Sequence, residues 1–293
     1  MTWRLALNLL LLMACCGLNA AQFSGSLHDH PPVVVAGKEV ILCELAGLTP
    51  CLTRVPEGVK AQLPADIPTL LGYRAALVTP VSHPEIAGVI VMAPERTQSR
   101  ESAIIAGSLL ELPLAEQFTL TLWHEIGHLE VRALQGSVLP DILSVREQEW
   151  LADAYLYWRI AKEKGSLTLA WQQFHRRNLQ AINDVNQLSH WSSLYLLPLL
   201  NRYDAKELAL FAEFGAFCQD FYPNIPQWSD EELREFASLL HNLFQSGNTR
   251  IMPDFMYWRK PQLRPVLAPT LDLLMGSDNA QQWLSRQHML IKG

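Results

Sequence analysis

The segment "LWHEIGHLE", residues 122–130, places two histidines four positions apart, with Glu125 beside the first of them. It lies within residues 113–136, which begin with proline and end with glycine, a pattern typical of a helix. On a helix, residues four apart share one face, so His124 and His128 can direct both imidazoles at one metal ion. Glu125 then lies at the edge of that face, where it can reach a water on the metal without binding the metal itself.

Gly127 needs an explanation if this segment is helical, because a glycine inside a helix costs about 1 kcal/mol relative to alanine. Close approach of another backbone would provide one. The apolar neighbours of the histidines leave a second interpretation open, in which His124 and His128 are hydrogen-bonded residues of a helical core. A third metal ligand from another part of the chain separates the two interpretations.

A second helix is expected shortly after the first. Ser144 and Glu147 have the spacing of a capping box, and Gly165 marks the other end. Because the cap explains Glu147, the acids of interest are Glu149 and Asp153 in "EWLAD", which are four apart and share a face. Their apolar and aromatic neighbours argue against a solvated acidic stripe.

The two motifs "HEIGH" and "EWLAD" together resemble those of the gluzincin-type zinc metallopeptidases, over roughly residues 113–165. The resemblance implies a zincin-like fold and a bound Zn²⁺, with Ala152 allowing the two helices to pack closely. The metzincin pattern is excluded, since residue 134 is leucine where that class has a third histidine. By this resemblance, His124, His128 and Glu149 would be the three zinc ligands. Glu125 would be the general base, and Asp153 would be the carboxylate that orients a ligand histidine.

Peptide hydrolysis also needs a group that stabilises the oxyanion, and gluzincins usually supply it from a later segment. His190 is the first candidate, since it follows both motifs at an expected helix start. Tyr195 lies one turn further on, and His175 and His241 are alternatives; any of these could instead be a cap or surface residue. Residues 102–112, expected to form a strand, are the candidate edge for pairing with an extended substrate.

The first 20 residues have the features of a secretory signal peptide, with Arg4 before a short apolar run and small residues after it. An alternative remains open, because "LMAC" resembles a bacterial lipobox. In that case the leader ends at Ala14 and Cys15 carries a lipid. Both alternatives take the mature chain out of the cytoplasm.

Three cysteines remain beyond the leader. Cys43 and Cys51 flank a short segment that contains glycine and proline and can turn back on itself, so we expect a disulfide between them in an oxidising compartment. We interpret Cys218 as a buried free thiol.

The expected fold is α+β, with a small N-terminal β-sheet followed by a mainly helical zincin-like body, residues 22–293, in one domain. Residues 22–113 form its β-rich part, 114–165 its metal-binding helices and 166–293 its helical part. Strands are expected within residues 33–45, 73–81, 87–94 and 102–112. Further helices are expected at residues 167–183, 190–201, 204–221, from 229 onward, 266–275 and 278–289.

The composition of the chain limits the classes of function that it can have. The chain has 293 residues, of which 49% are hydrophobic, enough to bury a substantial core. The formal charge is −6, so the composition does not indicate the basic surface that nucleic-acid-binding proteins typically have. The leading hypothesis is an exported zinc metallopeptidase, periplasmic or secreted and possibly an envelope lipoprotein. It would act on a peptide or protein substrate and contact a membrane only if lipidated at Cys15. The alternative is a non-catalytic, zinc-containing binding or scaffold protein of the cell envelope on a peptidase-like fold.

Overall fold

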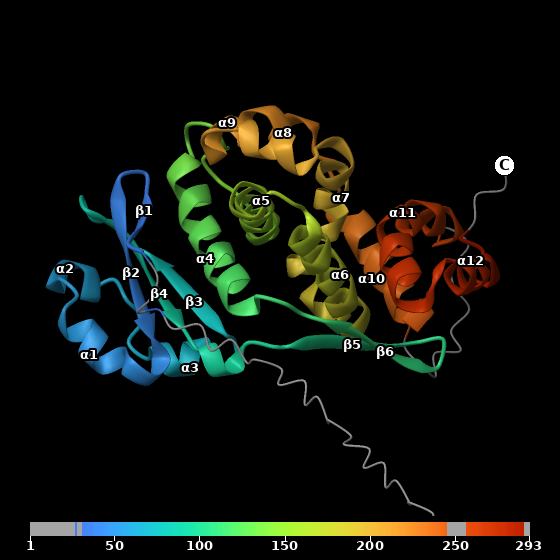
Figure 1. The fold of residues 1–293 in the computed structure, drawn as a ribbon, viewed down its shortest axis with the longest axis horizontal. Coiled ribbons are helices and arrows are strands. Elements are labelled where there is room, and N and C mark those ends of the chain that lie inside the picture. The colour runs from blue at the N-terminus through green and yellow to red at the C-terminus, as the bar shows by residue number, and fades with distance from the viewer. Residues whose placement is uncertain (1–26, 28–30, 245–255, 290–293) are drawn as a thin grey trace, which may run out of the picture.

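The protein has the expected α+β architecture in a computed structural model that describes Leu27, residues 31–244 and residues 256–289. A small sheet and the short helices α1 to α3, within residues 48–71, lie at one end, and a largely helical body extends from them (Figure 1). The predicted leader, including the alternative lipid site at Cys15, falls outside the described residues. Within the described ranges, no helix is both long and apolar enough to cross a membrane.

The main sheet is mixed and has the strand order β1-β2-β4-β3. Its central pair, β2 and β4, is parallel, while β1 and β3 run antiparallel to their neighbours. Strand β3 is therefore an edge strand, with β4 as its partner in the sheet. The bounds of the four strands are Val33–Val35 for β1, Lys38–Glu44 for β2, Ala76–Pro80 for β3 and Ile86–Met92 for β4.

Both faces of this sheet are covered. On β4, Ile90 and Met92 face the large core that continues into the helices, whereas Val89 and Val91 belong to a smaller cluster on the other face. That second face is covered by α1 (Leu48–Thr53), α2 (Glu57–Lys60) and α3 (Ile67–Leu71). The predicted Cys43–Cys51 disulfide is present and joins β2 to α1. Cys218 is a buried free thiol, as expected.

Two long helices, α4 (Gln117–Leu134) and α5 (Val145–Lys164), carry the two sequence motifs. Helix α5 begins and ends as predicted, with a complete capping box between Ser144 and Glu147 and a left-handed glycine, Gly165, at its C-terminal end. Helix α4 lies against β3 and β4 on one side and against α5 on the other (Figure 1). The sheet therefore supports the helix that carries both histidines.

The remaining helices enclose α5 and extend the body away from the sheet (Figure 1). They share one continuous hydrophobic core with α4 and α5. Their bounds are Thr168–Asn183 for α6, Ser193–Arg202 for α7, Ala205–Leu210 for α8, Phe214–Phe221 for α9, Asp230–Phe244 for α10, Met256–Met275 for α11 and Ser277–Arg286 for α12, with short 3₁₀ turns at Pro94–Arg96 (η3), Val185–His190 (η4) and Tyr222–Asn224 (η5).

The segment expected to be a single strand at residues 102–112 is instead a hairpin of β5 (Arg100–Ile105) and β6 (Ser108–Pro113). Ala106 and Gly107 both have positive φ, at 53° and 80°, as two-residue hairpin turns with a matching twist require. An Ala-Gly pair is a weak turn signal, so the sequence pattern does not predict the turn at this position. The hairpin runs beneath α6 towards α11 (Figure 1).

Two helix predictions were also incomplete. The helix expected over residues 204–221 is broken into α8 and α9, because α5 side chains bind the carbonyls at the break: Trp158 donates to Phe211 and Lys162 to Ala212. Helix α11 begins earlier than expected and contains three prolines four residues apart. Leu263 and Leu267 on this helix are fully buried, so tertiary packing overrides the tendency of proline to end a helix.

Gly127 lies at a close contact between α4 and α5. A Cβ at this position would lie 2.8 Å from the Ala152 carbonyl oxygen and 3.0 Å from the Ala152 Cα. The glycine is thus explained by close approach of another backbone, as the sequence suggested, and the small side chain of Ala152 lies at the contact.

We predict that Gly127→Ala destabilises the protein by about 1–2 kcal/mol, because the clash between helices outweighs the gain in helix propensity. Gly58→Ala is the matched control. Gly58 is also in a helix, α2, but a Cβ there meets nothing within 4 Å, so its change should be neutral or stabilising. Urea unfolding of both variants measures the difference. Equal stability changes at the two positions would contradict the proposed helix contact.

Glu130, at the end of the motif segment, lies near Arg159, Glu213 and Cys218. Burial raises the pKa of Glu130 to about 7; Arg159 opposes this shift and Glu213 adds to it. Between the ordinary value and about 7, the folded protein binds more protons than the unfolded chain. Stability therefore falls as pH rises through that range and is level above it.

We predict that Glu130→Gln abolishes this fall. The variant should match the wild type in stability near pH 4.5, and should be more stable by about 1–3 kcal/mol at about pH 8. Urea unfolding as a function of pH tests this. The same pH dependence in both proteins would contradict the assignment.

Candidate metal centre

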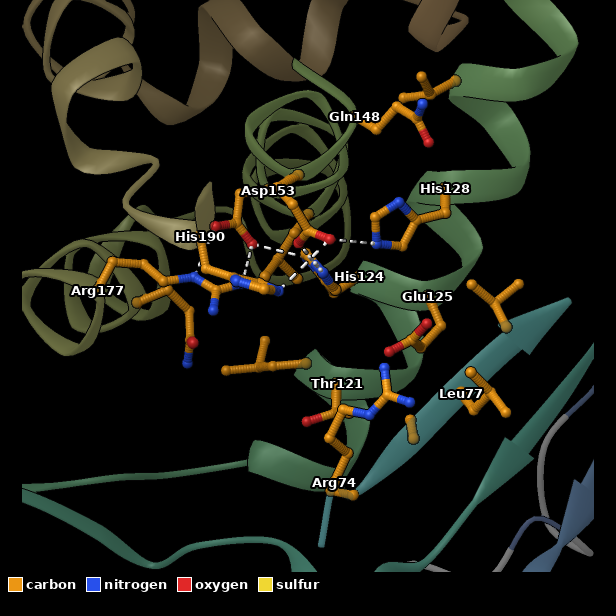
Figure 2. A pocket seen from close by; sticks show the side chains of 18 of the residues that line it. Arg74, Leu77, Thr121, His124, Glu125, His128, Gln148, Asp153, Arg177 and His190 are labelled. Carbon is orange, nitrogen blue, oxygen red and sulfur yellow. Dashed lines mark hydrogen bonds and ion pairs between the residues drawn. The ribbon is translucent and has the colours of Figure 1, made fainter. Parts of the chain in front are cut away.

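His124, His128 and Glu149 come together where α4 and α5 pack side by side. One potential ligand atom from each lies within 4.8 Å of those of the other two, and all three side chains are partly buried. The His124 Nε2 atom is 3.4 Å from Glu149 Oε2, and the His128 Nε2 atom is 3.8 Å from Glu149 Oε1. Figure 2 shows the two imidazoles on one side of α4, directed towards α5. The sequence therefore identified a cluster that could hold a metal ion.

Asp153 holds His124 in place from the buried side. Its Oδ1 atom lies 2.7 Å from His124 Nδ1, which leaves Nε2 of the same ring directed at Glu149. The carboxylate also accepts two hydrogen bonds from Arg177, at 2.8 and 3.0 Å, and one from the Ser192 hydroxyl. Asp153 is 1% exposed, so these partners compensate for a buried negative charge.

Burial and mutual contacts set the protonation states of the cluster. Burial alone would raise the pKa of Glu149, but its close contact with His124 outweighs burial and lowers the pKa to about 2. Burial, and then the charge of His124, lowers the pKa of His128 to about 4. Burial also opposes a charge on His124, but Asp153 outweighs it and raises the pKa of His124 to about 10. At neutral pH, Glu149 is thus ionised and His128 neutral, as metal binding requires, whereas His124 must lose a proton to solvent before its Nε2 atom can bind a metal ion.

The donor set fits a divalent transition metal. Two imidazole nitrogens and one carboxylate form the ligand set of many catalytic zinc sites. The Glu149 Oε2 atom is buried and has no hydrogen-bond partner among the described residues. Such an atom is costly to leave unpaired, and coordination of a metal would satisfy it.

A cavity of about 490 Å³ opens over the cluster. One wall is the edge strand β3 with the two residues before it, and the opposite wall is formed by α6 and the end of η4. Glu125 lies in this cavity between the candidate metal ligands and Arg74 (Figure 2). Burial raises the pKa of Glu125, and the charge of His124 opposes that shift.

His190 also reaches the site. It is the last residue of η4, three positions before α7 begins, and not at a helix start as expected. Its Nε2 atom lies 3.5 Å from Glu149 Oε1, and its side chain is 44% exposed. The alternatives lie elsewhere: His175 contacts Thr270 in the core, Tyr195 stacks on Trp150, and His241 is in α10.

Sequence reasoning missed Arg177, Ser192 and the β3 edge. The hairpin at residues 100–113 was the expected substrate edge, but none of the described residues that line the cavity belongs to it. Of these three, only Arg177 has a signal in the sequence. It is a basic residue on the helix that follows the one carrying Asp153. Ser192 has no such signal, because its role depends on how the chain turns after η4.

We predict that Arg177→Met destabilises the protein by about 3–5 kcal/mol, since the buried Asp153 carboxylate would keep its charge and lose its cation. The double variant with Asp153→Asn should recover part of this loss, because no uncompensated charge remains. Denaturant unfolding of both single variants and the double variant forms a double-mutant cycle. Strictly additive changes would contradict the pairing.

Comparison with known proteins adds no further evidence on this site. No protein-family model, no curated protein and no solved structure matches the chain. What can be concluded about its activity therefore depends on the side chains that α4 and α5 bring together and on the cavity above them.

Proposed function

We propose that the protein is an exported, gluzincin-type zinc metallopeptidase that hydrolyses peptide bonds. The observation that carries the proposal is the convergence of His124, His128 and Glu149, with Glu125 beside them, in a cavity bordered by a free sheet edge. An isolated metal site would need neither the adjacent carboxylate nor the cavity. A peptidase needs both.

Zinc is the metal proposed, held by His124, His128 and Glu149. Two histidines and a carboxylate leave a coordination position open in catalytic zinc sites. When bound, zinc would lower the pKa of a coordinated water and polarise a carbonyl oxygen. Asp153 accepts a hydrogen bond from the Nδ1–H group of His124 and so keeps the ring oriented. A hydrogen bond of this kind to a ligand histidine increases metal affinity in other proteins.

Glu125 is the proposed general base. It comes directly after His124 and lines the same cavity, so it lies within reach of a water beside the two histidines. A base works best when its pKa approaches the working pH, and burial shifts the pKa of Glu125 upward. The Glu125 carboxylate would take the proton from the attacking water and pass it to the leaving amine.

His190 is the proposed oxyanion stabiliser. Its imidazole lies beside Glu149 on the cavity side. A partly exposed ring there would turn to donate a hydrogen bond to a bound carbonyl oxygen.

The β3 edge, and not the hairpin, is the proposed strand edge with which an extended substrate pairs. Residues 75–78 and Pro80 line the cavity along this edge, and the outer edge of β3 has no strand partner among the described residues. An extended peptide can add to such an edge through backbone hydrogen bonds. The peptide would then pass the histidines of α4, against which β3 packs.

The test begins with zinc content. Purified protein should contain about one zinc per chain by mass spectrometry, and Glu149→Gln should reduce this sharply. Glu147→Gln is the matched control, because Glu147 is on the same helix but belongs to the capping box. An absence of zinc in the wild type, or its retention in Glu149→Gln, would contradict the proposal.

Activity is tested with Glu125→Gln. We predict that this variant keeps its zinc and cleaves an unstructured protein substrate about 10²–10⁴ times more slowly than the wild type. A chelator should abolish wild-type cleavage, and added zinc should restore it. The competing function is that of a zinc-containing binding or scaffold protein of the cell envelope. It is favoured if the wild type binds zinc but cleaves no substrate faster than the Glu125→Gln variant does.

A further inference from the structure

One end of the cavity is built from polar side chains of α6. Gln173, Arg176 and Gln180 line it there, and they are three or four residues apart, so they share a face of the helix. Arg176 donates to the side chain of Gln117, the first residue of α4, at 3.0 Å. This end therefore lies beside the first turn of α4, whereas the metal ligands lie near the middle of that helix.

Two hydrogen-bond donors at this end are unsatisfied. Gln173 is 3% exposed; its oxygen accepts from Arg176, but its Nε2 atom has no partner among the described residues. The same is true of the Arg176 Nε atom. A buried donor without a partner typically lowers the stability of the fold by about 1–3 kcal/mol. Two such donors side by side therefore suggest that an acceptor binds between them.

The charge of Arg176 is only loosely balanced. The nearest carboxylate, that of Glu101 on β5, is 3.9 Å from Arg176 Nε, and the same Glu101 oxygen accepts a hydrogen bond from Gln180. The neighbouring Arg177 is fully engaged with Asp153. Burial, and then the charge of Arg177, lowers the pKa of Arg176 to about 10, as expected of a cation that lacks a close anion.

The carboxylates that line the cavity are not available to Arg176. Glu149 belongs to the metal cluster and Asp153 to the Arg177 pair. Glu125, on α4, has Arg74 as the arginine beside it (Figure 2). An anion that satisfies Arg176 and Gln173 must therefore come from outside. A carboxylate fits best, because it can accept hydrogen bonds from a guanidinium and an adjacent amide together.

We propose that Gln173 and Arg176 form a subsite that binds a carboxylate of the peptide substrate, either an acidic side chain or the free C-terminus. This inference rests on the proposed peptidase function, because it assigns a substrate class to the same cavity. It selects peptides that place a negative charge at the α6 end while a peptide bond lies over the metal cluster.

The experiment measures binding separately from cleavage. The full-length mature protein carrying Glu125→Gln is loaded with zinc, and fluorescence anisotropy reports the binding of labelled nine-residue peptides of neutral sequence. One set carries a single Glu, Gln or Lys at each position in turn and has an amidated C-terminus. A second set is neutral and has either a free or an amidated C-terminus. Comparison of the two sets shows whether a side chain or the C-terminus supplies the carboxylate.

We expect at least one carboxylate-bearing peptide to bind about tenfold more tightly than its neutral counterpart. The advantage should disappear with Arg176→Gln. It should also disappear with Gln173→Glu, which places a competing carboxylate beside Arg176 and keeps the arginine itself. Arg286→Gln is the control for net charge, since Arg286 is an exposed arginine in the last turn of α12 and does not line the cavity; it should keep the advantage.

Equal binding of charged and neutral peptides, no binding of any peptide, or an advantage that survives both Arg176→Gln and Gln173→Glu would overturn the subsite. If Arg176→Gln does not fold, as judged by its thermal unfolding, Gln173→Glu decides alone. Wild-type cleavage without any preference for acidic peptides overturns the subsite and leaves the peptidase proposal standing. Tight, Arg176-dependent binding of a peptide that the wild type never cleaves supports the subsite and overturns the peptidase proposal.

Discussion

The close contact between Gly127 and Ala152 is the constraint on which the site depends. It brings α4 and α5 together along two matching stripes, in which residues three and four apart share a face. A larger side chain at either position would separate the helices and move Glu149 away from the histidines. The stripes are His124, Gly127 and His128 on α4, and Glu149, Ala152 and Asp153 on α5. The small residues in each motif are thus as necessary to the geometry as the ligands.

Asp153 connects this helix pair to the rest of the body. It contacts His124 on α4, Arg177 on α6 and Ser192 beyond η4. The neighbour of Ser192, Trp191, donates to Asn178, and the Asn178 amide donates to the Val266 carbonyl and the Thr270 hydroxyl of α11. A chain of buried contacts therefore runs from His124 to α11, made of hydrogen bonds and one step along the backbone from Ser192 to Trp191. Because every described member of it has a partner, it can fix one arrangement of these helices.

The parts that the sequence predicted well are those that depend on local spacing. The capping box at Ser144, the end of α5 at Gly165 and the pairing of residues four apart all follow from rules within a single helix. Because "HEIGH" and "EWLAD" each lie on one helix, their side chains could be assigned to faces before the fold was known. The disulfide between Cys43 and Cys51 was predictable for the same reason, since only a short turn separates the two cysteines.

The rest could not be predicted because it depends on which elements meet. Arg177 is one of two adjacent arginines on α6, and nothing in the sequence tells which of them reaches Asp153. The choice of β3 as the edge beside the cavity follows from a strand order in which β4 is inserted between β2 and β3. The break between α8 and α9 depends on Trp158 and Lys162, which lie some fifty residues earlier in the chain.

The two adjacent arginines of α6 illustrate how a buried charge is explained. Arg177 stabilises the fold through Asp153, and its burial is compensated by two short hydrogen bonds. Arg176 is buried to a similar degree, with 20% of its side chain exposed against 12% for Arg177, yet it has no comparable partner. A chain selected for stability alone would gain by replacing Arg176 with an apolar residue of similar size. Where local rules are broken without a structural benefit, a functional one is expected, and the position of Arg176 in the cavity wall indicates where to look for it.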